Sequence, residues 1–134
     1  MVAAGLVALV VFLFPASAVI RQRPSRAEQV RSRAKFEMSS LVAALRQYRD
    51  EYHLLPSGTH AEILGELRGD NAKKVIFFEA NSRSFNSGGE LMDPWGMPYR
   101  FRGEERGIPR VYSYGPNKQD DGGREKTDDV VSWR

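Results

Sequence analysis

The sequence predicts an α+β fold, in which a long N-terminal helix packs on a small antiparallel β-sheet that ends in an acidic C-terminal loop. The first observation is an apolar residue at every third or fourth position from Val30 to Tyr52, which indicates a helix with one buried face. The second is two short segments in which polar and apolar residues alternate, a pattern typical of strands. The third is a run of glycines and aspartates between Ser113 and Trp133.

Length and composition set the limits of this fold. A chain of 134 residues has room for one small domain once a membrane segment is set aside. Hydrophobic residues make up 41% and charged residues 28%, which is ordinary for a globular protein. Because the chain has no cysteine, disulfides, thiolate zinc sites and thiol catalysis are excluded.

The N-terminal segment is long enough to span a membrane. Val2 to Ile20 contains no charged residue, and a bilayer span needs roughly 20 residues. The alternative is a cleaved signal peptide, because Ala16-Ser17-Ala18 resembles a cleavage site and would leave a chain starting at Val19. Against this, no Lys or Arg precedes the apolar run. We therefore expect a membrane segment at 1–20 and a globular domain at 21–134 that includes the rest of the long helix.

Basic residues are concentrated just after the apolar run. A cluster of this kind beside a membrane anchor suits anionic lipid headgroups. The sequence shows no basic surface interspersed with aromatic residues, so nucleic-acid binding is not predicted. By the positive-inside rule alone, the cluster would place the C-terminal domain in the cytoplasm. The residues concerned are Arg21, Arg23, Arg26, Arg31, Arg33 and Lys35.

Capping motifs mark where two helices begin. Ser25 and Glu28 have the spacing of a capping box, and the helix that follows should end before Pro56. Tyr48 and Tyr52 lie on its apolar face, so we interpret them as core residues. Thr59-His60-Ala61-Glu62 is a second capping box, and it predicts a short helix that Gly69 stops.

The strands are predicted from shorter patterns. Residues 74–78, of which the last four are apolar, indicate a buried strand or a strand-like segment. Residues 99–102 and 110–114 alternate, which predicts a hairpin across 103–109. Before them, Asp93-Pro94-Trp95-Gly96 has the residues of a tight turn, from which Trp95 can fold back over the sheet edge.

The acidic loop has the chemistry of a calcium site. Asp120, Asp121, Asp128, Asp129 and Asn117 supply hard oxygen donors, of which calcium takes six to eight. The carboxylates would repel one another without a counter-ion. The spacing is not that of an EF-hand. On the residues alone, a solvated acidic tail explains the pattern equally well.

Enzymatic readings have less support in the sequence. His53 lies at a helix end and His60 within a capping motif, and neither has a nucleophile or carboxylate at a catalytic spacing. No nucleophile elbow, phosphate-binding loop or zinc-protease motif is present in the sequence. We therefore predict a protein that is not an enzyme. The rival in this class is a small periplasmic hydrolase that uses the acidic loop and a metal.

Three stretches resemble the major pseudopilin of type II secretion systems, in the type IV pilin-like group. The first is the turn Asp93-Pro94-Trp95-Gly96-Met97-Pro98-Tyr99. The others are Tyr112-Ser113-Tyr114-Gly115-Pro116-Asn117 and Asp128-Asp129-Val130-Val131-Ser132-Trp133. With the helix 33–56 and its exit, the resemblance covers most of residues 33–134.

The resemblance implies a pilin-like fold with a C-terminal metal-binding loop and a non-catalytic role. Subunits would stack by their N-terminal helices into a periplasmic filament that supports protein export. Calcium would be bound by the carbonyl groups of Tyr114 and Val131 and by the side chains of Asn117, Asp128 and Asp129. Because Asn117 stands where the family has Asp, Asp120 or Asp121 would restore the charge.

The implied setting is the bacterial inner membrane, crossed once, with the globular domain in the periplasm. The implied partners are other copies of the chain, other pseudopilins and the inner-membrane secretion platform. The family's Gly-Phe-Thr-Leu-x-Glu leader motif is absent, so we expect that it lies upstream of Met1, where a prepilin peptidase would cut it. The alternatives are a type IV pilus or competence-type pilin, and a soluble secreted calcium-binding domain left after signal cleavage.

Overall fold

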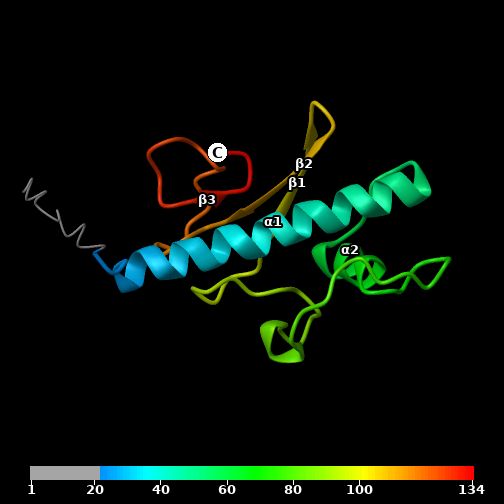
Figure 1. Ribbon diagram of the computed structural model, residues 1–134, viewed down its shortest axis with the longest axis horizontal. Coiled ribbons are helices and arrows are strands. Elements are labelled where there is room, and N and C mark those ends of the chain that lie inside the picture. Colours follow the sequence, from blue (N-terminus) through cyan, green and yellow to red (C-terminus); the bar gives the residue numbers. More distant parts are fainter. Residues whose placement is uncertain (1–21) are drawn as a thin grey trace, which may run out of the picture.

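The computed structural model describes residues 22–134, so the predicted membrane segment 1–20 lies outside the described residues. Two α-helices, α1 (Arg26–Tyr52) and α2 (His60–Leu67), come first, followed by the short 3-10 helix η1 (Ser82–Ser84). The strands are β1 (Arg100–Glu105), β2 (Ile108–Ser113) and β3 (Val130–Val131). They form an antiparallel sheet in the order β1-β2-β3, and α1 lies along it (Figure 1). The predicted α+β arrangement is confirmed.

Helix α1 begins at the predicted capping box. The Ser25 hydroxyl accepts from the Glu28 backbone N–H at 3.2 Å, and the Glu28 carboxylate accepts from the Ser25 N–H at 2.6 Å. The helix ends at Tyr52, and the next residue, His53, caps it with a left-handed φ of 62°, three residues before Pro56. Its buried residues recur at helical spacing, as predicted; they are Ala34, Met38, Leu41, Ala44, Leu45 and Tyr48.

The core lies between α1, α2 and the inner face of the sheet. Leu67 from α2 and Val111 from β2 are fully buried there, together with Met38 and Leu41 of α1. Tyr48 is 6% exposed and Tyr52 packs against the same cluster, as predicted. The two rings lie 4.5 Å apart between centroids. The sheet and α2 are therefore both packed on the face of α1 that runs from Ala34 to Tyr48.

Two of the strand predictions need correction. Residues 74–78 form no strand, because their backbone turns back on α2: the N–H groups of Phe77 and Phe78 both donate to the Leu67 carbonyl. Phe78 is buried, but Ile76 is 56% exposed. The hairpin strands extend further than predicted, and only Arg106 and Gly107 separate them. Strand β3 was not predicted as a strand, because two residues are too few to show alternation.

No described helix combines the length and the apolar character that crossing a bilayer requires, over residues 22–134.

Candidate metal centre in the C-terminal loop

The acidic loop, residues 114–129, leaves the sheet from β2 and returns to it as β3. Tyr112 pairs with Val131 and Ser113 with Val130. The Ser132 N–H also donates to the Val111 carbonyl at 2.9 Å, and the Ser132 hydroxyl accepts from the Val111 N–H at 3.0 Å. Both ends of the loop are therefore fixed on the central strand.

Gly115 brings the two ends of the loop into direct contact. A Cβ atom at this position would lie 2.0 Å from the Asp128 carbonyl oxygen, and the φ angle of Gly115 is 68°. No other residue type can combine that backbone conformation with that approach. As a result, the segment that carries Tyr114 and Asn117 passes beside Asp128 and Asp129.

The buried carboxylate of Asp93, in the tight turn before β1, fixes the start of the acidic loop. Asp93 is 5% exposed, and its Oδ1 accepts from the backbone N–H groups of Trp95 and Met97, both at 2.9 Å. The fully buried Ser113 hydroxyl donates to Asp93 Oδ2 and accepts from the Gly115 N–H at 3.0 Å. The tight turn and the acidic loop are thus joined by one hydrogen-bonded chain, since a buried carboxylate needs such partners.

The remaining residues of the turn pack the sheet against α1. Tyr99 is 2% exposed and donates its hydroxyl proton to Glu37 of α1. Burial first, and then this bond, raises the pKa of Tyr99. Trp95, which follows Pro94, is partly buried against the core, and Gly96 has a φ of 88°.

Three of the predicted metal-binding residues are connected by hydrogen bonds, and of these Asp129 is buried, Asp121 half-buried and Asn117 exposed. Asp129 is 7% exposed; its Oδ2 accepts from the Gly123 N–H at 2.7 Å and its Oδ1 from the Asp121 N–H at 3.4 Å. The Asn117 amide donates to Asp121 Oδ2 at 3.1 Å. Asn117, Asp121 and Asp129 therefore form a hydrogen-bonded linked set, in which Asp121 contributes its backbone N–H to Asp129 and Asn117 Oδ1 accepts from the Gln119 N–H at 2.9 Å.

Asp121 also lies 3.8 Å from the Arg124 guanidinium, and the other two predicted carboxylates have their partners outside this set. Asp120 accepts from the Tyr112 hydroxyl at 3.2 Å. Burial first, and then the charge of Asp120, raises the pKa of Tyr112 to about 12. Asp128 lies 3.5 Å from the guanidinium of Arg31 on α1. Asp128 thus ties the loop to the helix, a contact between residues far apart in the chain.

Tyr114 and Val131 were predicted to contribute carbonyl oxygens. The Tyr114 ring lies 5.9 Å from that of Tyr112, with the Arg100 guanidinium 5.2 Å from its centroid. Val131 is buried in β3 beside Tyr112. Their assignment as ligands stays a prediction.

The donor chemistry of the linked set fits calcium. Carboxylate and amide oxygens are the hard ligands this ion prefers, commonly supplemented by backbone carbonyls and water. Over residues 22–134, however, no three acidic or histidine side chains converge as a ready-made metal cage. The fit therefore rests on two carboxylates and one amide.

Two residues that organise this region were not predicted from the sequence. Ser113 was seen only as part of a motif, and Arg31 only as part of a basic cluster. The position of Ser113 at the end of an alternating segment, two residues before Gly115, is a weak sequence signal that its hydroxyl bonds within a turn. Nothing in the sequence indicates that Arg31 meets Asp128, because the pairing depends on how the loop is laid against α1.

A helix laid along a small antiparallel sheet, with a C-terminal loop closed on the central strand, is the arrangement of a pilin-like subunit. A model of the protein family described as type II secretion system (T2SS), protein G matches residues 20–133, well over half of the chain. The chain belongs to this family of major pseudopilins. No curated protein and no solved structure matches it.

Proposed function

We propose that the chain is a non-catalytic structural subunit of a type II secretion pseudopilus. The family match carries this proposal, because it extends over both the long helix and the C-terminal loop. In this role the apolar segment 1–20 anchors the subunit in the bacterial inner membrane and then stacks in the filament core. The globular domain lies in the periplasm, and the partners are further copies, other pseudopilins and the secretion platform.

The proposal includes one calcium ion bound to the C-terminal loop. Asn117, Asp121 and Asp129 would hold it, with the carbonyl groups of Tyr114 and Val131 as further ligands. The ion would supply positive charge to carboxylates that otherwise repel one another. Asp120 and Asp128 remain expected ligands that would first have to leave Tyr112 and Arg31.

The experiment that tests the subunit role is removal of the gene from its own host. Export of folded proteins to the medium should stop, and the intact gene should restore it. Overproduced chain should appear in the sheared surface fraction as filaments visible by electron microscopy. Normal export in the deletion strain, together with no filaments, would reject the proposal.

A further inference from the structure

A basic groove lies between the outer face of α1, the β1–β2 turn and the C-terminal residues. Its volume is about 750 Å³. Four arginines and one glutamate line it, together with exposed apolar surface that includes Ile108 and Trp133. The charged residues are Arg46, Arg106, Arg110, Arg134 and Glu105.

The positive charge of the groove is only partly neutralised. Arg110 pairs with Glu105 and lies 5.0 Å from the centroid of the Trp133 ring. Arg46 and Arg106 are exposed, and neither has a carboxylate partner among residues 22–134. Ile108 is 44% exposed beside them. A surface that combines free guanidinium groups with apolar area suits an apolar polypeptide segment that also carries an unpaired carboxylate.

Arg106 occupies a backbone position that suits it poorly. It and Gly107 form the two-residue turn between β1 and β2, with φ angles of 51° and 73°. Such a turn favours Asn-Gly or Gly-Gly, because both central residues have positive φ. A residue without this preference costs about 1 kcal/mol or more there, and strain of this kind is concentrated at functional positions. The fold itself therefore gives no reason for an arginine at the tip.

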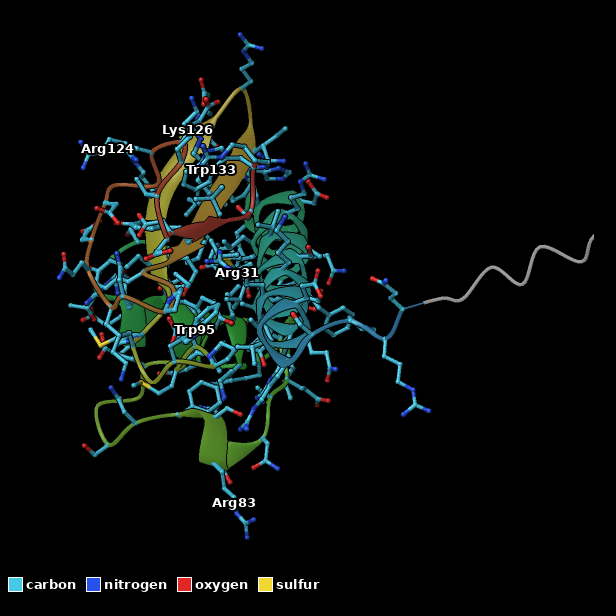
Figure 2. All side chains as sticks on the ribbon, turned by 90° about the vertical axis from the view of Figure 1, so that its left-hand side faces the viewer. Arg31, Arg83, Trp95, Arg124, Lys126 and Trp133 are labelled. Carbon is cyan, nitrogen blue, oxygen red and sulfur yellow. The ribbon has the colours of Figure 1, made fainter. Side chains whose placement is uncertain are left out.

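A second surface, with exposed apolar side chains and one carboxylate unpaired over residues 22–134, lies on the other side of α1; its one lysine, Lys74, lies 3.8 Å from Asp70. The segment 74–80 has no strand partner, and its Val75 and Ile76 are 37% and 56% exposed. Glu79 is exposed and has no ion pair within the described residues. The green segment that contains it lies below α1 in Figure 1, whereas the hairpin and the red C-terminus lie above. Figure 2 shows the same separation, with Trp133 on the side of the hairpin.

We propose that segment 74–80 of one copy docks in the basic groove of the next copy. Glu79 would lie between Arg46 and Arg106, and Ile76 would pack on Ile108 and Trp133. The two surfaces belong to opposite sides of one chain, so the contact is head-to-tail and repeats along an assembly. This inference rests on the proposed function, and adds to the stacking of N-terminal helices a specific contact between globular domains.

Disulfide cross-linking in the full chain tests the contact directly. The chain has no cysteine, so the double variant Ile76→Cys/Ile108→Cys carries the only two thiols. On mild oxidation in membranes it should give a ladder of dimers, trimers and larger species on a non-reducing gel. Each single variant has one thiol per copy, so it can form a dimer at most, whereas a ladder requires a thiol on both surfaces of every copy.

Charge reversal then tests the role of the arginines. In the double-cysteine chain, Arg106→Glu should lower the yield of the ladder about tenfold, since like charges would meet Glu79. Adding Glu79→Arg should restore it. Lys118→Glu is the matched control, because Lys118 is an exposed basic residue with a φ of 58° that does not line the groove. Circular dichroism checks that each variant folds. Glu79→Arg alone should also lower the yield of the ladder, because it would face Arg46 and Arg106 with a like charge.

The outcomes separate this inference from the function on which it rests. Wild-type filaments without a 76–108 ladder would overturn the contact and leave the subunit role intact. A ladder that Arg106→Glu and Glu79→Arg leave unchanged would also overturn it. An absence of wild-type filaments, with normal export in the deletion strain, would count against the proposed function itself.

Discussion

At Gly115 the first turn of the acidic loop presses against its last residues. Gly115→Ala would place a Cβ atom 2.0 Å from the Asp128 carbonyl oxygen, at a φ of 68°. The backbone must shift to relieve this contact, so we expect a loss of about 2–4 kcal/mol in the free energy of unfolding. Urea denaturation of the purified chain measures it.

Gly122 provides the control for this substitution. Its φ of 69° is nearly the same, but a Cβ atom there would meet nothing within 4 Å. Gly122→Ala should therefore lower the free energy of unfolding only by the cost of placing alanine in the left-handed conformation, about 1 kcal/mol. Equal losses for the two variants would show that the closure of the loop at Gly115 is not a stabilising contact.

His60 makes stability depend on pH. Burial first, and then the nearby Arg100 guanidinium, lowers the pKa of His60, while Glu90 opposes the shift. Below the unfolded pKa of about 6.5, the unfolded chain binds a proton that the folded chain resists. The free energy of unfolding should thus fall as the pH is lowered through this region.

Urea denaturation between pH 7.5 and 5 measures this dependence. In the His60→Gln variant the slope should flatten, because the group whose pKa differs between the two states is gone. The same slope in wild type and variant would contradict the role given to burial of His60.

Single residues with a local motif were predictable from the sequence, and those defined by distant partners were not. Both capping boxes could be predicted because Ser25–Glu28 and Thr59–Glu62 contain all of their partners within four residues. Asp93 was predicted only as part of a tight turn. Its bond to Ser113 joins positions 20 residues apart, and only the packing of the turn on the sheet brings them together.

At the scale of an element, the acidic loop offers two adjacent carboxylates in different environments. Asp129 is buried and accepts from two backbone N–H groups, so Asp129→Ala would leave both without a partner. We expect a loss of about 2–3 kcal/mol in the free energy of unfolding, measured without calcium. The side chains of Asp128 and Arg31 are both roughly half exposed. Asp128→Ala should therefore lower the free energy of unfolding by less than about 1 kcal/mol.

The comparison of these two variants has a clear contrary result. If Asp128→Ala is the more damaging substitution, the loop is held mainly by its tie to α1 and not by its internal hydrogen bonds. Amide exchange at Gly123 gives a second readout, since this N–H donates to Asp129 at 2.7 Å. Its protection should fall in Asp129→Ala and persist in Asp128→Ala.

Among the elements, α1 was the most predictable and segment 74–78 the least. The long helix repeats its pattern over seven turns, so a few exceptions do not obscure it. A run of four apolar residues after Lys74 is ambiguous, because it contains no period that distinguishes a strand from a chain folded against a helix. In the structure the Leu67 carbonyl takes the N–H groups of Phe77 and Phe78, which a strand would have given to a neighbour.

For the whole molecule, contacts from three directions hold the acidic loop in place. Asp93 reaches its start through Ser113, β3 fixes its end, and Arg31 of α1 contacts Asp128. The helix that carries Arg31 is also the one expected to continue into the membrane. A change in the loop can therefore act on the packing of the globular domain against α1, and this is how a bound ion would affect stability.

Calcium should raise the melting temperature of the full chain in detergent. A ligand that binds only the folded state adds roughly 2.7 kcal/mol at a concentration of 100 times its Kd. For a domain of this size that shift amounts to several degrees, measured by circular dichroism with calcium and then with excess chelator. Magnesium should have a smaller effect, because it is smaller and needs a stricter octahedral geometry.

Asp121→Asn is the matched variant for this measurement. It removes one charge from the linked set with Asn117 and Asp129 while keeping the size of the side chain, which lies only 24% exposed. In chelator the melting temperature of the variant should be close to that of wild type. Calcium should raise the melting temperature of the variant by less than it raises that of wild type. If wild type melts at one temperature in calcium and in chelator, the contacts of the loop with Asp93, β3 and Arg31 hold it without a metal ion. The metal part of the proposal then fails while the pseudopilin fold stands.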